Sequence, residues 1–274
     1  MQESKFSFHL YGSEIFGCHV EPKVVTGVVV LVHGFGEHSG RYKAAVIPIL
    51  TDLGLGVVTY DNIGHGKSGG KRGHCPSYEA LLDILATVID KAKELHPKKP
   101  LFLYGHSMGG NLVLNYALRR KEDFAGIIAT SPYLRLAFKP PKWKMFLGKM
   151  LLKVLPSVTL PSGLDANGIS RNPEEVTKYQ NDSMIYDAVS PMYSFPVMDA
   201  GEWALANAHT LNCEALLLHG TRDQIIDHTA TIEFHQKASN TTLKLYEGGY
   251  HELHHDLCKE AMLEDIHKWL KERI

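Results

Sequence analysis

The feature that most constrains this sequence is a serine with a glycine two positions away on each side. Residues 105–109 (GHSMG) follow a short apolar run and precede a stretch with a helical pattern at residues 110–120. A serine at a sharp strand-to-helix turn has a strained backbone, and a larger side chain at Gly105 or Gly109 would clash there. The pattern therefore predicts that Ser107 is a nucleophile at the end of a buried strand. The alternative is a glycine-rich turn in which the serine caps a helix.

Short β-rich runs recur along the chain and predict eight strands. Helical patterns lie between several of them, such as the apolar face formed within residues 81–92. This alternation implies an α/β fold with a mostly parallel sheet and helices on both of its faces. The first two runs, joined by residues 11–13, predict an antiparallel hairpin at the sheet edge. The predicted strands are residues 5–10, 14–20, 27–32, 56–60, 101–104, 126–130, 215–218 and 242–246.

The β-rich runs stop between residues 131 and 207, where Pro, Lys, Met and Tyr become frequent. The chain of 274 residues, 44% of them hydrophobic, is long enough to bury one large core and to carry an insertion. We therefore predict a core formed by residues 1–133 and 205–274, with a helical cap inserted at residues 134–204.

Within the predicted cap, residues 142–155 have apolar side chains at helical spacing and lysines elsewhere around the helix. Residues 133–164 include no acidic residue, so this stretch is a local positive patch in a chain with a formal net charge of -1. The apolar face of such a helix can pack over the core, or it can lie in a membrane interface. We expect one or both, the second as a peripheral contact with a membrane or micelle.

The balance of 29 Lys and Arg against 30 Asp and Glu gives no overall field that would favour nucleic acid. The first residues lack the pattern of a secretory signal, and no apolar run is long enough to span a membrane, so we expect a cytoplasmic protein. The spacing of the cysteines indicates free thiols and not a disulfide framework or a zinc knuckle. They are Cys18, Cys75, Cys213 and Cys258.

A serine hydroxyl is a weak nucleophile, so it needs a histidine to take its proton and an acid to orient that histidine. In sheets of this type the order along the chain is serine, acid and histidine, each on a loop after a strand. Asp223 follows the predicted strand at 215–218, and His251 follows the last predicted strand. We therefore predict a triad of Ser107, Asp223 and His251, whereas Asp227 lies further along and should begin the next helix.

The oxyanion that forms on an attacked carbonyl needs two backbone N–H donors. The amide of Met108, directly after the nucleophile, is the first predicted donor. The second normally comes from the turn after an earlier strand, which here is residues 33–36 (HGFG), and we assign it to the amide of Phe35. This chemistry requires no cofactor and no metal.

Two further motifs suggest other chemistry. Residues 64–68 (GHGKS) end like a phosphate-binding loop, but the first glycine of that motif would fall at Asp61. Residues 251–255 (HELHH) match the zinc-protease pattern, but the glycine and histidine of its extended form would fall at Cys258 and Ala261. Nucleotide binding is a remote alternative because the loop lacks that glycine. A zinc protease is a remote alternative because the serine triad already uses the first of these histidines.

Several strings, in order along the chain, resemble the monoacylglycerol lipase family of α/β-hydrolases. They are residues 33–42 (HGFGEHSGRY), 61–68 (DNIGHGKS), 105–110 (GHSMGG), 219–223 (HGTRD) and 246–254 (YEGGYHELH). The resemblance implies an α/β-hydrolase core with a lid, and hydrolysis of a small lipid ester, a monoacylglycerol, to fatty acid and glycerol. Lysophospholipases share these strings, so a lysophospholipase or a general carboxylesterase is an alternative, and a non-catalytic binding protein of the same fold is a more distant one.

The resemblance agrees with the same triad and the same two amide donors, and it adds a polar pocket around the glycerol end of the substrate. The positions that match this pocket are Glu37, Arg41, His106, Tyr179 and His254. Phe35 departs from the smaller residue that is common at its position in the family. Because the donor is the backbone, we expect the chemistry to be unaffected and the space beside the oxyanion hole to be narrower.

Overall fold

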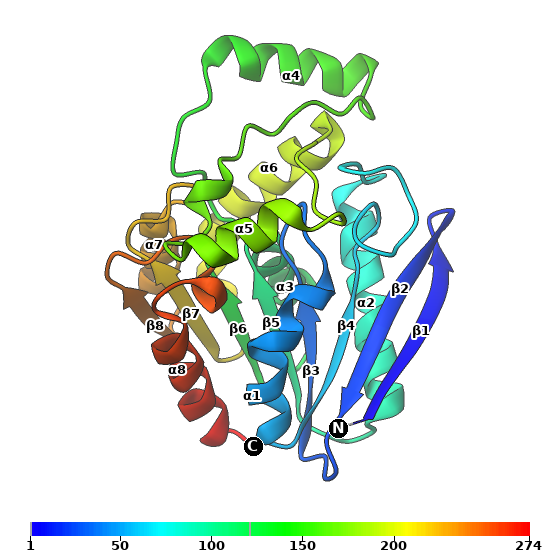
Figure 1. Cartoon of the computed structure of the whole chain (residues 1–274), viewed down its shortest axis with the longest axis vertical. Helices are drawn as coiled ribbons and strands as arrows, with labels where there is room; N and C mark the ends of the chain where they lie inside the picture. Colours follow the sequence, from blue (N-terminus) through cyan, green and yellow to red (C-terminus); the bar gives the residue numbers. More distant parts are fainter. Residues whose placement is uncertain (1, 121) are drawn as a thin grey trace.

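The computed structural model describes residues 2–120 and 122–274, which form a twisted sheet with helices on both faces (Figure 1). The eight strands lie in the order β1-β2-β4-β3-β5-β6-β7-β8. They are β1 (Gln2–Leu10), β2 (Ser13–Glu21), β3 (Gly27–Val32), β4 (Leu55–Tyr60), β5 (Leu101–His106), β6 (Gly126–Thr130), β7 (Ala215–Gly220) and β8 (Thr241–Tyr246). Every predicted strand is present, and the predicted α/β-hydrolase fold is confirmed.

Strands β3 to β8 run parallel, and the hairpin of β1 and β2 forms the predicted antiparallel edge. The inner strands β3, β4, β5, β6 and β7 have only buried residues, because helices cover both faces of a parallel sheet. The helices are α1 (Val46–Asp52), α2 (Tyr78–Leu95), α3 (Met108–Arg120), α4 (Lys142–Val154), α5 (Pro173–Asn181), α6 (Pro191–Asn207), α7 (His228–Lys237) and α8 (Lys259–Lys271).

Two apolar clusters fill the space between the sheet and its helices. One joins α2, α3 and the buried side of α6 to one face of the sheet, and the other joins α1 and α8 to the opposite face. Parallel strands bring their carboxyl ends to one edge of the sheet, so the loops after β3, β5, β7 and β8 meet there. These four loops carry the residues that the sequence predicts to be catalytic.

Between β6 and β7 the described residues form helices and turns, without a further strand of the sheet, as the end of the β-rich runs predicts. Figure 1 shows α4 and α5 beyond the carboxyl ends of the strands. Helix α6 packs closely on α3, where the side chains of Asn111 and Asn115 donate hydrogen bonds to the carbonyls of Val197 and Ala200 (3.2 and 3.1 Å). The division into a core and a cap at residues 134–204 stays a prediction.

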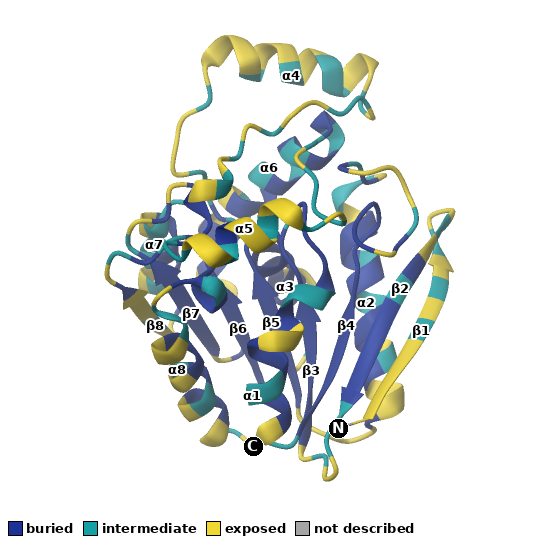
Figure 2. Cartoon of the chain, in the orientation of Figure 1, coloured by how far each residue is buried: buried dark blue, intermediate teal, exposed yellow. Residues whose placement is uncertain are grey.

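Helix α4 forms where the sequence predicts it, but none of its residues is buried (Figure 2). Trp143 and Phe146 are 64% and 68% exposed, so the interpretation in which the apolar face packs over the core is wrong for these side chains. The helix approaches the rest of the molecule at Gly148, which lies against the ring of Phe195 in α6. Within residues 2–120 and 122–274, no helix is both long and apolar enough to cross a membrane.

Candidate active site

Ser107 lies at the turn between β5 and α3, with a φ of 53° in the left-handed region that non-glycine residues rarely adopt. A Cβ atom at Gly105 would overlap the carbonyl of Gly109, and one at Gly109 would overlap the carbonyl of Val32 in β3. The predicted clash is therefore present on both sides of the serine. The tight turn directs the Ser107 side chain toward the loops at the carboxyl edge of the sheet.

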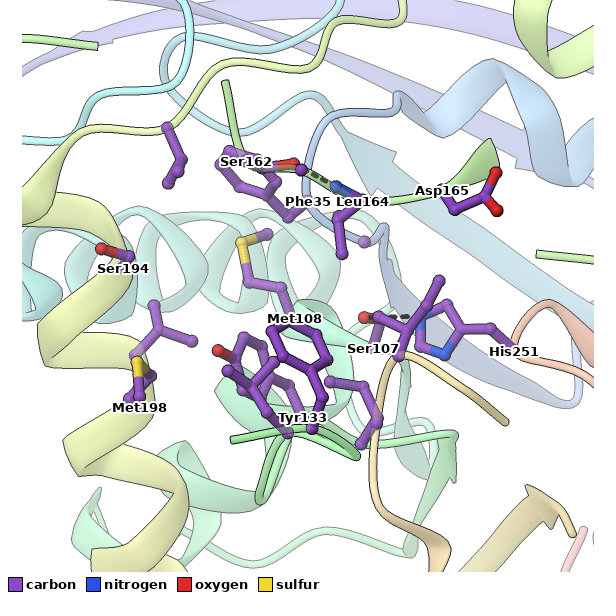
Figure 3. A pocket seen from close by; sticks show the side chains of 18 of the residues that line it. Phe35, Ser107, Met108, Tyr133, Ser162, Leu164, Asp165, Ser194, Met198 and His251 are labelled. Carbon is purple, nitrogen blue, oxygen red and sulfur yellow. Dashed lines mark hydrogen bonds between the residues drawn. The ribbon is translucent and has the colours of Figure 1, made fainter. Parts of the chain in front are cut away.

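The structure brings Ser107, His251 and Asp223 together in one hydrogen-bonded chain. His251 Nε2 lies 2.9 Å from Ser107 Oγ, and His251 Nδ1 lies 2.7 Å from Asp223 Oδ2 (Figure 3 shows the first contact). Because a carboxylate only accepts hydrogen bonds, Nδ1 carries the proton and the unprotonated Nε2 accepts from the serine hydroxyl. This is the tautomer that a general base for Ser107 needs.

Further hydrogen bonds fix the orientation of the Asp223 carboxylate. Its Oδ1 accepts the backbone N–H groups of Ile225 and Ile226 (2.8 and 3.0 Å), and its Oδ2 also lies 3.0 Å from His219 Nε2. Burial alone would raise the pKa of Asp223, but the charge of His251 and the hydrogen bonds with His219 and His251 hold it well below its usual range. Asp227 instead caps α7, as predicted, by accepting the N–H of Thr229 (2.9 Å).

The pKa of His251 reflects two opposing effects. Burial of the ring lowers the pKa, but the charge of Asp223 and its hydrogen bond outweigh burial and raise it above its ordinary value. The same carboxylate therefore orients the ring and stabilises its protonated form. A serine next to such a histidine can attack a carbonyl and pass its proton to the ring.

The loop after β3 lies directly beside the nucleophile. A Cβ atom added to Gly34 would be 3.4 Å from the Cβ of Ser107. Glu37 holds this loop, because its Oε1 accepts the N–H of Gly34 (2.6 Å) and the hydroxyl of Tyr42 (2.7 Å). The amide of Met108 follows the serine directly in the chain, and the amide of Phe35 belongs to the loop that lies beside it. Neither amide N–H donates a hydrogen bond to another of the described residues.

The predicted polar residues gather on one side of Ser107. Glu37, His106 and Tyr179 line the same cavity as the serine and are called its polar wall below. Arg41 and His254 do not line the cavity but contact residues of this wall. The Arg41 guanidinium sits 4.9 Å from the centre of the Tyr179 ring, and the His254 ring packs 4.9 Å from that of His106. Burial, with His251 as the next cause, lowers the pKa of His106 to about 3, and burial holds the pKa of His254 well below its ordinary value.

Arg41 is held by two carboxylates, and one of them, Glu252, is not among the residues that the sequence predicts for this site. Its Nη1 bonds Glu37 (2.8 Å) and Glu252 (2.6 Å), and its Nη2 bonds the other oxygen of Glu252 (2.7 Å). Glu252 also lines the cavity and follows His251 directly. The signal in the sequence that could have identified Glu252 is its position in residues 246–254, one of the strings that resemble the lipase family.

A cavity of about 360 Å³ extends from Ser107 and is mainly apolar. Figure 3 shows Ser107 and His251 at one end and Ser194 and Met198 of α6 at the other, with Phe35 and Leu164 opposite Tyr133. The apolar lining residues include Phe35, Met108, Tyr133, Leu136, Phe138, Met145, Leu164, Ile169, Val189, Phe195, Val197, Met198, Ile225 and Ile226. An elongated hydrocarbon chain can therefore lie with its carboxyl end at the serine.

The two competing motifs do not form their expected sites. The zinc-protease pattern needs both histidines on one helix, but His251 bonds Ser107 and Asp223 while η4 (Leu253–His255) is a separate 3-10 turn. Ligand atoms of Glu252, His254 and His255 lie within 4.8 Å of one another, but Arg41 occupies both oxygens of the carboxylate.

In the other motif, Asp61 replaces the glycine that a phosphate-binding loop needs. Its carboxylate accepts the backbone N–H groups of Ser39 and Lys67 (2.9 and 2.8 Å). An acid thus takes the N–H of Lys67, a backbone donor that a bound phosphate would need, and its charge would repel a phosphate. The nucleotide-binding interpretation is therefore wrong at this loop.

A serine and histidine at the carboxyl edge of a mostly parallel sheet define the class of α/β-hydrolases. The family model described as "Serine aminopeptidase, S33" matches residues 23–258, and the chain belongs to this family. Human monoglyceride lipase is 31% identical over 272 residues, covering 96% of this chain and 88% of the human protein. This confirms the resemblance to the monoacylglycerol lipase family.

Two further comparisons define how far the likeness extends. The crystal structure of monoacylglycerol lipase from Paleococcus ferrophilus superposes with a TM-score of 0.86 at 36% identity, covering 93% of this chain and 98% of that one. An uncharacterised abhydrolase domain-containing protein of Dictyostelium discoideum is 35% identical over 258 residues. The match covers 92% of this chain but only 27% of the length of that protein.

Proposed function

We propose that this protein is a serine hydrolase that cleaves monoacylglycerols to fatty acid and glycerol. The observation that carries the proposal is the hydrogen-bonded chain of Ser107, His251 and Asp223 at the junction of an apolar cavity and a polar wall. The similarity to the human monoglyceride lipase and to the Paleococcus monoacylglycerol lipase supports a monoacylglycerol as the substrate. A non-catalytic binding protein of the same fold would not require a complete hydrogen-bonded set of serine, histidine and acid.

In the proposed mechanism, His251 takes the proton of Ser107 while Oγ attacks the ester carbonyl. The amides of Phe35 and Met108 bind the oxyanion, and Asp223 stabilises the imidazolium. When the tetrahedral intermediate collapses, its bond to the glycerol oxygen breaks, and His251 returns the proton to this leaving group. His251 then deprotonates a water molecule, which attacks the acyl-enzyme and releases the fatty acid and free Ser107.

The charges of the polar wall favour glycerol over a phosphate head group. Glu37 and Glu252 share the single guanidinium of Arg41, so this cluster has an excess of negative charge. Burial alone would raise the pKa of Glu37, but the charge of Arg41, together with the hydrogen bond from Tyr42 and the neighbouring histidines, lowers it, so the carboxyl stays ionised. A phosphate would meet like charges, which costs several kcal/mol, whereas glycerol hydroxyls can donate to carboxylates. We therefore prefer a monoacylglycerol to a lysophospholipid, and assign Glu37, Arg41, His106, Tyr179 and His254 to the glycerol end.

We also propose that α4 contacts the membrane or micelle that holds the substrate. The helix lies beyond the carboxyl edge of the sheet, and its side chains Trp143, Phe146 and Met150 are exposed. The sequence has no acidic residue from 133 to 164, so the lysines of the helix have no acidic neighbour along the chain. Apolar and basic groups on one exposed helix are typical of interfacial binding. Met145 and Lys144 of the same helix line the cavity, which supports a path from the lipid surface to Ser107.

The contact can be tested with a variant that carries Trp143→Glu and Phe146→Glu. We expect binding to phosphatidylcholine–phosphatidylglycerol vesicles, measured by sedimentation, to fall at least about tenfold, because two apolar anchors become charged. Val24→Glu is the matched control, since Val24 is 71% exposed and precedes β3, at the opposite end of the strands. Equal binding by the double variant and the control would remove the proposed contact.

The substrate proposal is tested by fatty acid release from monooleoylglycerol and from lysophosphatidylcholine, each with the wild type and Ser107→Ala. We expect hydrolysis of the monoacylglycerol, little of the lysophospholipid, and no turnover of either by Ser107→Ala. Preference for the lysophospholipid would retain the triad but contradict the glycerol site. Full activity of Ser107→Ala would contradict the nucleophile, and covalent labelling of Ser107 by a fluorophosphonate in the presence of a chelator provides an independent check.

A further inference from the structure

The loop that carries Phe35 is surrounded by aromatic rings from distant parts of the chain. The Phe35 ring makes edge contacts with the rings of Tyr193, His65 and Tyr186, at centroid distances of 4.9, 5.5 and 5.8 Å. Tyr186 and Tyr193 come from the segment that ends in the first turn of α6. The rings of His65 and Tyr186 also contact each other, so Phe35 packs against rings that are themselves in contact.

Tyr193 contacts both residues whose amides we assign to the oxyanion. Its ring packs against Phe35, and its hydroxyl donates to the sulfur of Met108. The side chain is only 2% exposed, and the N–H of Tyr193 bonds the capping hydroxyl of Ser190 (3.2 Å). A single buried side chain therefore bridges the loop after β3 and the start of α3.

Main-chain and side-chain contacts connect the same two regions. The N–H of Tyr186 donates to the carbonyl of Gly36 (3.1 Å), and His38 Nε2 lies 2.9 Å from Asp182 Oδ2. Gly36 has a φ of 76°, and a Cβ atom there would lie 2.8 Å from the carbonyl oxygen of Tyr186. The loop after β3 is thus attached to residues 182–193 at Phe35 itself and at the residues that follow it.

The helix that carries Tyr193 is itself fixed to the helix that starts at the nucleophile. Asn111 and Asn115 of α3 donate hydrogen bonds to carbonyls within α6, so the two helices keep one relative position. An oxyanion hole works only when its donors lie at hydrogen-bond distance from the oxygen in the transition state. Displacement of such a group by about 1 Å can cost a factor of about 100 in rate.

We propose that Tyr193 is a positioning residue for the oxyanion hole, because it sets the relative position of the Phe35 and Met108 amides through contacts with both side chains. The inference rests on the proposed serine hydrolase function, but not on the identity of the alcohol. The structural alternative is that Tyr193 merely forms part of the wall around the acyl chain, since it also lines the cavity.

The two roles can be separated with p-nitrophenyl acetate, whose acyl group is too short to reach along the cavity. We expect Tyr193→Leu, which removes both contacts, to lower kcat about tenfold with little change in KM. Tyr193→Phe retains the ring contact with Phe35 and should recover most of kcat. Trp203→Leu is the matched control, because Trp203 is an aromatic residue of α6 outside the cavity that packs on Arg119.

A second measurement reports directly on the oxyanion. Phenylboronic acid forms a tetrahedral adduct with a nucleophilic serine, and one of its oxygens occupies the oxyanion hole. We expect its inhibition constant for Tyr193→Leu to rise by the same factor as kcat falls. If Tyr193→Leu does not fold, as judged by its melting temperature, Phe35→Leu tests the same ring contact from the other side.

Wild-type turnover of p-nitrophenyl acetate that Ser107→Ala abolishes first establishes the hydrolase itself. Its absence would overturn the proposed function and this inference together. If the wild type is active but kcat and boronate affinity are unchanged in Tyr193→Leu, or in Phe35→Leu, the positioning role alone is overturned. A change restricted to KM for monooleoylglycerol would likewise assign Tyr193 to the acyl wall only.

Discussion

Helices α3 and α4 have the same length, 13 residues, but opposite environments. In α3 every residue from Met108 to Leu118 is buried between the sheet and α6, whereas α4 has no buried residue (Figure 2). Both contain apolar residues at helical spacing, so the pattern alone does not determine what covers the apolar face. Neighbouring elements make the difference: α3 follows directly from the buried strand β5, and α4 lies beyond the strand ends.

The two helices also differ in what they contribute to the proposed function. The first turn of α3 holds Ser107 in its strained conformation and supplies the Met108 amide, so its position must be fixed closely. Helix α4 has no residue in the hydrogen-bonded chain from Ser107 to Asp223. Changes near α3 should therefore affect every substrate, whereas changes on the exposed face of α4, at Trp143 and Phe146, should affect only substrates that are held in a lipid surface.

The largest effect should come from Asp223, the acid that orients His251, which in turn bonds the serine at the start of α3. We expect Asp223→Asn to lower kcat by a factor on the order of 10⁴ for both soluble and vesicle-borne esters, because His251 loses its orientation and its favoured tautomer. Steady-state kinetics with p-nitrophenyl acetate and monooleoylglycerol would measure this. If kcat fell only for the vesicle-borne ester, changes near α3 would not affect every substrate, and the proposed difference between α3 and α4 would be wrong.

The pH profile of the same variant provides a further check on this site. His251 must be neutral to accept a proton, so kcat/KM should rise with pH through a midpoint above about 6.5, because Asp223 raises the pKa of His251. In Asp223→Asn the carboxylate charge is absent, and the midpoint of the remaining activity should move to lower pH. An unchanged midpoint would show that Asp223 does not control the protonation of His251.

A pair of leucines compares the structural importance of the helices. Leu114 of α3 is fully buried, and Leu147 of α4 is 46% exposed. We expect Leu114→Ala to lower the free energy of unfolding by about 2–5 kcal/mol, since it leaves a cavity. Leu147→Ala should change it by less than about 0.5 kcal/mol. Urea denaturation of both variants measures the difference, and comparable losses would mean that α4 is covered in solution.

The smallest effect should come from the lysines of α4. One basic residue near an anionic bilayer contributes about 1 kcal/mol, so Lys149→Gln should weaken binding to phosphatidylglycerol-containing vesicles about fivefold. Pure phosphatidylcholine vesicles, or high salt, should remove this difference. Lys23→Gln, in the loop before β3, is the control. If the two lysine variants bind alike, α4 does not face the anionic surface.

Much of the fold and of the site follows from local signals in the sequence. Gly105 is required by a clash within the turn itself, with the carbonyl of Gly109, so the local pattern around Ser107 was sufficient to predict it. Gly109 belongs to the same five-residue pattern, although the carbonyl that a Cβ there would overlap is that of Val32 in β3. Asp223 and His251 each follow a recognisable strand, and a parallel sheet brings such positions to one edge. The eight strands were predictable because their apolar runs are short and bounded by turn residues.

Features that depend on contacts between distant segments were not predictable. The bonds from Arg41 to Glu252 join residues far apart in the chain, and no local pattern indicates that this guanidinium binds a second carboxylate. The contacts of Tyr193 with Phe35 and Met108 need the arrangement of α6 on α3. The exposure of α4 also depends on which distant segments pack against it, so the sequence did not predict it. The cytoplasmic location and the limits of the cap stay predictions.

The most direct test of the account is fatty acid release from monooleoylglycerol in anionic vesicles, followed for the wild type, Ser107→Ala and the Trp143→Glu, Phe146→Glu variant. We predict fast release by the wild type, none by Ser107→Ala, and about tenfold slower release by the α4 variant, which should hydrolyse soluble p-nitrophenyl acetate at the wild-type rate. Release by Ser107→Ala, or equal rates on vesicles for the wild type and the α4 variant, would contradict it.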